Sequence, residues 1–282
     1  MNSGAVGRAP PQIEDRMTNT DESRVAAGYD AVYTGLPDSP TFRRIWRTHS
    51  LGSDYPEGFE HISFLTLSEM RSMAATLALG PGSTLVDLGC GMGGPGLWIA
   101  SQARAHLVGI DLSDVALDHA RDRARALVPP VEATFAQGSF SHTGLEAASA
   151  DGAMSVDALQ YAPDKRAALD EVARVLRPGA RFAFVCFELE PERIAGLPVL
   201  GTDPVSDYAP LLAEAGFETE SYETTAGWRE RVTATYQALI EARPALAEEM
   251  GDAASVALLG EVALTLQLQP YRRRVMVCAT RR

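Results

Sequence analysis

A glycine-dense turn between an apolar run and a helical pattern constrains this chain more than any other feature. The apolar run Thr84–Leu88 contains one acid, Asp87, and is followed directly by Gly-Cys-Gly-Met-Gly-Gly, after which a helical pattern begins near Pro95. Glycine adopts backbone angles that other residues avoid, and it lets a ligand approach the main chain. A turn of this kind before a helix presents backbone N–H groups to a nucleotide-like ligand.

A second acid follows at the spacing that such a ligand requires. The apolar stretch 107–110 reads as a buried strand and ends at Asp111, twenty residues after Gly91. In doubly wound folds an acid at this place accepts hydrogen bonds from ribose hydroxyls. The sequence therefore predicts a ligand that contains adenosine.

The glycine spacing does not by itself identify the ligand. Gly89, Gly91 and Gly94 satisfy G-x-G-x-x-G, the pattern of dinucleotide sites, so a nicotinamide-dependent oxidoreductase is one alternative. Asp87 argues against that alternative because its carboxylate would repel a pyrophosphate. An acid suits a ligand with an ammonium group and no phosphate, and S-adenosyl-L-methionine is such a ligand.

Several ordered segments resemble the motifs of class I S-adenosylmethionine-dependent methyltransferases. They are LVDLGCGMG, GIDLS from Gly109, GSF from Gly138, DGAMSVDALQY from Asp151 and RVLRPGARFAF from Arg174. The resemblance extends over about residues 60–187 and implies an enzyme that transfers a methyl group from S-adenosyl-L-methionine to a small molecule. The family's habits suggest an acceptor from secondary metabolism, and the methylated atom (O, N or C) stays open.

The order of the patterns predicts an α/β fold with a doubly wound, mostly parallel, Rossmann-like sheet of seven strands. We expect strands at the following ranges: 84–88, 107–111, 131–136, 152–156, 181–187, 217–224 and 273–279. We expect a disordered polar tail at 1–22, a helical cap at 23–80, and a methyltransferase core at 81–282. A helical insertion at about 226–266, before the last strand, is expected to form a lid.

Composition limits the partners. The formal charge is −12, and the one basic cluster, Arg272-Arg273-Arg274, is expected to flank the last strand, so a nucleic-acid acceptor is disfavoured. No apolar run approaches the roughly 20 residues of a membrane span, and no apolar signal core starts the chain, so we expect a cytoplasmic protein without a membrane partner. The cysteines lack metal-ligand spacing, so no metal is expected. Helical caps commonly pair, which leaves a homodimer open.

The resemblance also assigns cofactor contacts. It implies that the glycine loop and Asp87 hold the amino-acid end, that Asp111 holds the ribose, and that Leu112 and Phe140 pack beside the adenine. Ser139 stands where many relatives carry an aspartate that contacts the adenine amino group, and serine makes a weaker hydrogen bond. Ser63, in the cap, stands where relatives often place a serine that touches the cofactor carboxylate.

Candidates for chemistry follow the fourth expected strand. Ligands of parallel α/β sheets lie beyond the carboxyl ends of the strands, so Asp157 and Tyr161 are expected near the transferred methyl group. Asp157 reads equally as a carboxylate that orients the cofactor's amino group. Tyr161 stands where relatives often have histidine, and tyrosine is a poor base near neutral pH. His61, in an aromatic cluster of the cap, becomes the best base if that cluster lines the acceptor site instead of forming core.

A non-methylating cyclase or lyase on the same scaffold remains the main rival function. Such an enzyme would use the bound cofactor structurally or electrostatically, and detection of S-adenosylhomocysteine during turnover would exclude it. Glu60 and Glu188 are reserve candidates for a base.

Overall fold

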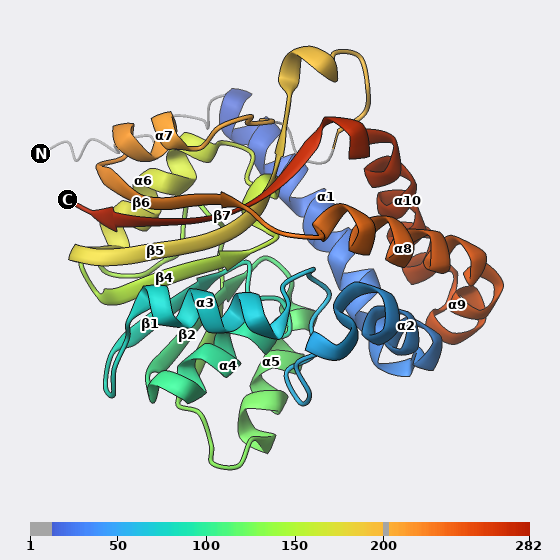
Figure 1. The fold of residues 1–282 in the computed structure, drawn as a ribbon, viewed down its shortest axis with the longest axis horizontal. Coiled ribbons are helices and arrows are strands. Elements are labelled where there is room, and N and C mark those ends of the chain that lie inside the picture. The colour runs from blue at the N-terminus through green and yellow to red at the C-terminus, as the bar shows by residue number, and fades with distance from the viewer. Residues whose placement is uncertain (1–12, 200–202) are drawn as a thin grey trace, which may run out of the picture.

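The computed structural model describes residues 13–199 and 203–282. Its centre is a seven-stranded sheet in the order β3-β2-β1-β4-β5-β7-β6, in which only β7 runs antiparallel to its neighbours (Figure 1). The strands are β1 (Thr84–Leu88), β2 (His106–Asp111), β3 (Ala133–Gln137), β4 (Ala150–Val156), β5 (Leu176–Leu189), β6 (Phe217–Thr224) and β7 (Arg272–Arg281). The expected doubly wound, mostly parallel sheet is confirmed.

Helices cover both faces of this sheet. One face packs against α3 (Leu67–Leu77), α4 (Gly94–Ala103) and α5 (Asp114–Ala126), and the other against α6 (Lys165–Val175) and α7 (Ala209–Glu214). Local signals fix these helices: Thr66 and Glu69 form a capping box on α3, and the Ser113 side chain caps α5. The two faces bury separate apolar clusters, because the strands are apolar on both sides.

A further layer of helices stands at the carboxyl ends of the parallel strands (Figure 1). It combines α1 (Ile13–Gly35), α2 (Pro40–Ile45) and a π-helical turn at Trp46–Leu51 with α8 (Trp228–Glu241), α9 (Arg243–Met250) and α10 (Asp252–Leu268). Short 3-10 turns occur at Leu36–Asp38, Gly52–Asp54, Leu159–Tyr161, Pro191–Arg193 and Gln269–Tyr271. A third apolar cluster joins the two groups of helices, which lie far apart in the sequence.

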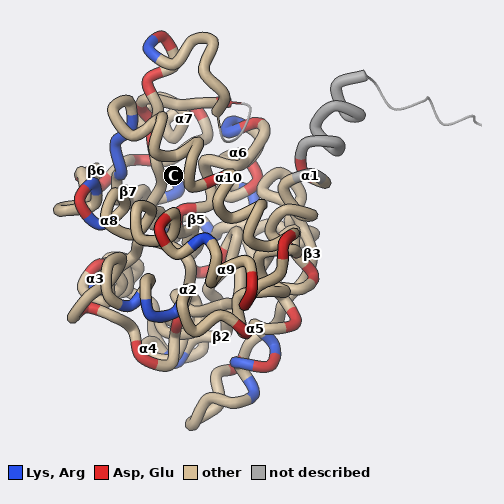
Figure 2. Tube along the Cα trace, turned by 90° about the vertical axis from the view of Figure 1, so that its right-hand side faces the viewer, with Lys and Arg blue, Asp and Glu red and all other residues tan. Residues whose placement is uncertain are grey.

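Polar contacts fasten this layer. The Asp30 carboxylate of α1 accepts from the Ser113 hydroxyl at 2.5 Å, and Glu249 of α9 accepts from both hydroxyls of Ser39 and Thr41. Figure 2, which faces the layer, shows α9 and α10 in front of the sheet, with acidic and basic segments interspersed. Cap and lid therefore form one cover over the strand ends.

Several boundaries differ from the expectations. Helix α1 begins at Ile13, inside the expected tail, and residues 1–12 lie outside the described residues. Strand β5 begins at Leu176, directly after α6, because Leu176 pairs with Ala150 of β4. Residues 177–180 form an irregularity that includes Gly179 with a φ of 81°, and regular pairing with β4 resumes at Arg181. The insertion consists of three helices, broken at Ala242 and at Gly251, whose φ of 83° ends α9. No helix among the described residues is long and apolar enough to cross a membrane.

Candidate active site

The glycine loop after β1 is held in a shape that only glycine adopts easily. Gly89, Gly91 and Gly93 have φ of 71°, 50° and 77°. A Cβ on Gly89 would lie 2.5 Å from the Ala158 methyl, and a Cβ on Gly91 would lie 2.6 Å from the Tyr33 hydroxyl. The loop thus lies between the turn after β4 and helix α1, and its backbone forms part of a cavity wall.

Asp111, at the end of β2, is tied to this loop. Its Oδ2 accepts from the Gly91 N–H at 2.7 Å, and its Oδ1 accepts from the Ser113 N–H at 2.9 Å. Burial raises the pKa of Asp111, and those N–H groups oppose the shift. Each carboxylate oxygen has a further lone pair, so the side chain can accept from a sugar hydroxyl as well.

Asp87 and His61 leave polar atoms without partners beside the loop. The Asp87 carboxyl is 2% exposed, and its Oδ1 has no hydrogen-bond partner among the described residues. Burial, and then the nearby Asp111, raise the pKa of Asp87 to about 8. The His61 Nδ1 lies 2.8 Å from the Ser63 hydroxyl, its Nε2 lacks a partner among the described residues, and burial lowers its pKa to about 4. Both residues line one pocket of about 380 Å³.

These orphaned atoms fit the amino-acid end of S-adenosylmethionine. An ammonium group beside Asp87 would return the carboxyl to its ionised form and supply the missing donor. The Ser63 hydroxyl lines the same pocket and can donate to a carboxylate, whereas the N–H groups of Gly89, Cys90 and Gly91 already donate to Ile110 and Asp111. The peptide around Ser63 is fixed, because the Ser63 carbonyl accepts from the Trp46 indole N–H at 3.2 Å.

A larger cavity of about 1230 Å³ adjoins this pocket. Its inner wall carries Asp111, Leu112, Ser139 and Phe140, the residues expected to hold the adenosine. The Ser139 hydroxyl lies 3.3 Å from that of Ser141. The outer wall is mostly apolar and aromatic. It comes from α1, α8 and α10, with further residues from α2, the π-helical turn, the segment before α3 and the end of β5: Val25, Tyr29, Val32, Phe42, Trp46, Phe64, Phe187, Tyr236, Leu258 and Val262. The residues expected to hold the nucleoside and the apolar outer wall thus line the same cavity.

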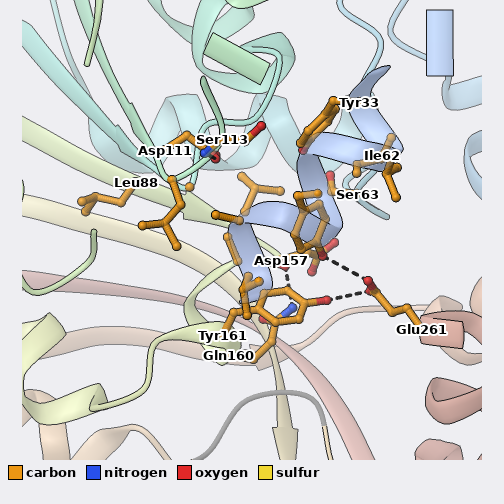
Figure 3. Close-up of a pocket in the computed structure, with 18 of the residues that line it drawn as sticks. Tyr33, Ile62, Ser63, Leu88, Asp111, Ser113, Asp157, Gln160, Tyr161 and Glu261 are labelled. Atoms are coloured by element: carbon orange, nitrogen blue, oxygen red, sulfur yellow. Dashed lines mark hydrogen bonds between the residues drawn. The ribbon is translucent and has the colours of Figure 1, made fainter. Parts of the chain in front are cut away.

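A carboxylate from the lid stands in this apolar wall (Figure 3). Glu261 of α10 accepts from the Tyr161 hydroxyl at 2.7 Å and from the Tyr29 hydroxyl at 3.3 Å. Burial raises the pKa of Glu261, and burial together with Glu261 holds the pKa of Tyr161 well above 10. Tyr161 is therefore a neutral donor at physiological pH.

Glu261 was not among the site residues expected from the sequence. The signal existed: Glu261 is the only charged residue between Asp252 and Arg272, in a helix otherwise rich in leucine, valine and alanine. A lone acid in such a helix has to face either solvent or a polar partner inside. The partner here, Tyr161, is 100 residues away in the chain.

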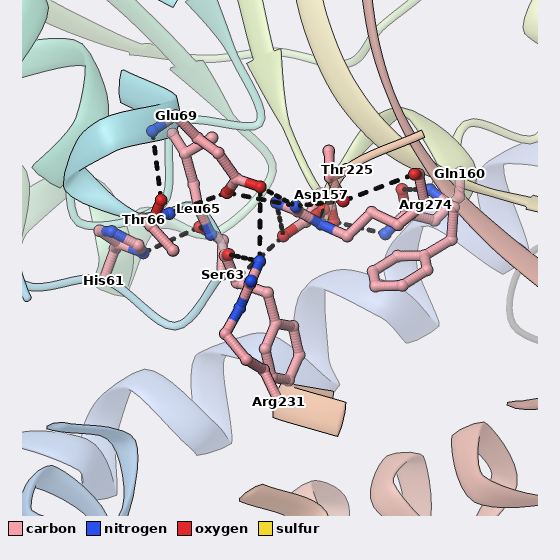
Figure 4. A network of polar contacts seen from close by, with 12 residues as sticks. His61, Ser63, Leu65, Thr66, Glu69, Asp157, Gln160, Thr225, Arg231 and Arg274 are labelled. Carbon is pink, nitrogen blue, oxygen red and sulfur yellow. Dashed lines mark hydrogen bonds and ion pairs between the residues drawn. The ribbon is translucent and has the colours of Figure 1, made fainter. Parts of the chain in front are cut away.

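Asp157 lines the cavity, but its carboxylate is already satisfied (Figure 4). Its Oδ1 accepts from Arg274 Nε at 2.9 Å, and its Oδ2 accepts from Arg274 Nη2 at 3.1 Å and from the Phe64 N–H at 2.8 Å. The residue has a φ of 49°, which is costly for a side chain with a Cβ. The geometry favours a positioning residue over a proton acceptor.

Arg272, Arg273 and Arg274 belong to β7. The expectation that this cluster flanks the last strand is therefore wrong. Arg274 is fully buried and also donates to Glu69 of α3, which in turn lies 3.4 Å from Arg231 of α8. Arg273 is half exposed and pairs with Glu188, so Glu188 is committed outside the cavity lining. Alternation along a strand points neighbouring side chains to opposite faces. Glu60 lies 3.8 Å from Arg123, away from the cavity.

Comparison with known proteins places this geometry in a known group. Residues 86–184 match the family model described as "Methyltransferase domain". The chain is 29% identical over 223 residues to 27-O-demethylrifamycin SV methyltransferase of Amycolatopsis mediterranei, covering 73% of this chain and 78% of that protein. It is 37% identical over 157 residues to squalene methyltransferase 2 of Botryococcus braunii, covering 55% of this chain and 39% of that protein.

Solved structures share the whole fold. The [4+2]-cyclase SpnF superposes with a TM-score of 0.71 at 20% identity, over 92% of this chain and 96% of that one. A Haemonchus contortus phosphoethanolamine N-methyltransferase 2, solved with S-adenosyl-L-methionine, superposes with a TM-score of 0.63 at 16% identity, over 86% of this chain and 56% of that one. At such identities the likeness concerns the fold alone.

Proposed function

Since the chain belongs to the class I S-adenosylmethionine-dependent methyltransferases and acts on a small molecule, we propose that it methylates a hydroxyl oxygen of a largely apolar acceptor. The observation that carries this proposal is Glu261, a carboxylate held by two tyrosines in the apolar wall opposite the expected cofactor residues. A hydroxyl acceptor loses a proton when it is methylated, and Glu261 is placed to receive it.

The cofactor supplies an electrophilic methyl group on a positive sulfur. In the reaction the acceptor oxygen forms a bond to the methyl carbon, the sulfur–carbon bond breaks, and the hydroxyl proton passes to Glu261. Asp87, Ser63 and the glycine loop would hold the amino-acid end, and Asp111 the ribose. The aromatic wall keeps water from the reacting atoms, which strengthens the interaction of Glu261 with the proton.

Two features favour oxygen over nitrogen. Arg272, which also lines the cavity, carries a positive charge that disfavours an ammonium acceptor. A relative that matches 73% of this chain is named for an O-demethylated substrate. The net charge of −12 supports a small molecule over nucleic acid as acceptor. A homodimer and a cytoplasmic location stay predictions.

A second candidate is C-methylation of an alkene. The aromatic faces of Tyr29, Trp46, Phe64 and Tyr236 would stabilise a carbocation, and squalene methyltransferase 2 is among the relatives. Incubation with methyl-labelled cofactor and a panel of metabolites, followed by NMR of the product, places the label on oxygen or on carbon. A cyclase that leaves the cofactor intact would release no S-adenosylhomocysteine.

The role of Glu261 has its own test. We expect Glu261→Gln to lower kcat by about 10²–10⁴-fold, the usual contribution of a general base, and to leave S-adenosylhomocysteine affinity unchanged. The matched control is Glu241→Gln, on the exposed face of α8. A Glu261→Gln enzyme with the wild-type rate would refute proton transfer to this carboxylate.

A further inference from the structure

Arg272 is a buried arginine at the start of β7 whose guanidinium forms no ion pair with any described residue. The residue pairs in register with Leu189 of β5, and its side chain is only 8% exposed. The guanidinium carbon lies 3.7 Å from the centre of the Phe187 ring, and both residues line the larger cavity. Stacking on this ring fixes the direction in which the guanidinium points.

The Nη1 atom of Arg272 is buried and has no hydrogen-bond partner among the described residues. The next two arginines in the chain do form ion pairs: Arg273 pairs with Glu188, and Arg274 pairs with Asp157 and Glu69. Burying a guanidinium donor without an acceptor costs free energy, so such an atom calls for an explanation.

Glu261 does not supply the missing acceptor. Its two oxygens accept from Tyr29 and Tyr161, and no ion pair joins it to Arg272 within the described part of the chain. The two residues nevertheless line the same cavity. A ligand that reaches Glu261 with a hydroxyl can therefore reach Arg272 with a second group.

The cofactor carboxylate is a poor match for Arg272. The pocket that fits the amino-acid end is lined by Asp87, His61, Ser63 and the glycine loop, and Arg272 is not part of it. Arg272 belongs instead to the cavity wall that carries Glu261 and Tyr236.

We propose that Arg272 binds an anionic oxygen group of the acceptor, so that the acceptor is a hydroxyl-bearing organic acid. The inference rests on the proposed function, because it takes this cavity as the acceptor site. Glu261 faces the hydroxyl that is methylated, and the Arg272 guanidinium donates from Nη1 to a carboxylate on the same molecule. A charge-assisted hydrogen bond in a low-dielectric cavity discriminates strongly between an acid and its neutral ester.

The test compares acids with esters in the dead-end complex with S-adenosylhomocysteine, where no methyl transfer is needed. The probes are hydroxynaphthoate, hydroxybenzoate and the methyl ester of each, and calorimetry measures their dissociation constants. We expect the wild type to bind an acid about tenfold to a hundredfold more tightly than its ester. Arg272→Gln should abolish this preference, Arg272→Lys should restore part of it, and Arg125→Gln, whose side chain is 72% exposed, should keep it.

A structural role for Arg272 predicts a different pattern. Removing an unmatched buried charge should not lower the thermal stability of the ligand-free protein, whereas removing a structural residue should. An acid preference that survives Arg272→Gln overturns the proposal. So does a wild-type protein that binds acid and ester equally, or that binds neither of them. If acids bind preferentially but no hydroxyl ever receives labelled methyl, the methyl-transfer proposal fails and the anion site stands.

Discussion

Removal of Arg274 is the sharpest test of how the site is held together. The guanidinium is fully buried and donates to both oxygens of Asp157, and also to Glu69. In Arg274→Met the Asp157 carboxylate keeps only the Phe64 N–H as a donor in the described structure. Leaving one partner of a buried pair uncompensated costs about 3–5 kcal/mol of unfolding free energy.

The double-mutant cycle separates this pair from ordinary effects. Asp157→Asn leaves Arg274 paired with Glu69, so we expect a smaller loss of about 1–3 kcal/mol. The double variant Arg274→Met/Asp157→Asn has no charge at either position, so neither position buries an unpaired charge. Its loss of unfolding free energy should therefore be smaller than the sum of the two single losses by at least about 1 kcal/mol. Urea unfolding followed by circular dichroism measures all four free energies.

The matched control is Arg181–Glu220, on the neighbouring surface of the same sheet. Its side chains are 38% and 35% exposed, so Arg181→Met and Glu220→Gln should couple by no more than about 1 kcal/mol. Strict additivity at Arg274 and Asp157, or a loss as small as that of the control, would refute the claim that Asp157 is a positioning residue. An unchanged pH dependence of kcat in Asp157→Asn would instead support a positioning role for Asp157.

Other expected outcomes concern the cofactor residues. Asp111→Ala should weaken S-adenosylhomocysteine binding by about 1–3 kcal/mol in calorimetry, and an unchanged dissociation constant would exclude a ribose contact. Gly91→Ala should weaken binding and stability, because φ is 50° and the Tyr33 hydroxyl is 2.6 Å from the new Cβ; Tyr33→Phe should relieve only the steric part. Since burial raises the Asp87 pKa to about 8, its contribution to stability is full below about pH 4 and is lost as pH rises through 8, so Asp87→Asn should flatten the pH dependence of the unfolding midpoint across that window. Burial lowers the His61 pKa to about 4, so stability should fall as pH drops below about 6.5, and a His61→Gln variant should lose that decline.

The core of the fold was predictable because its signals are local. The central strands β1, β2 and β4 are short, largely apolar runs, and the cap of α5 at Ser113 and the glycine turn after β1 can be read from neighbouring residues. The early start of β5 was not, since Pro178 and Gly179 usually end an element, and Leu176 joins the sheet only through its pairing with Ala150 of β4.

The site was predictable where it depends on one motif and not where it depends on distant contacts. Asp87, Asp111 and the glycine loop meet because adjacent parallel strands end at one edge. Glu261 meets Tyr29 across 232 residues, and Arg274 meets Asp157 across 117, and no local pattern announces either pair. Three consecutive arginines read as a basic cluster, although their strand turns Arg274 and Arg272 inward and Arg273 outward.

The carboxylate of Glu261 and the ring of Tyr29 come from opposite ends of the described chain, and both line the larger cavity. The residues expected to hold the nucleoside, Asp111, Leu112, Ser139 and Phe140, lie instead at the ends of β2 and β3 and belong to neither helix. Exchange of helices α1 and α10 between relatives should accordingly alter which molecules are methylated while leaving the methyl donor the same.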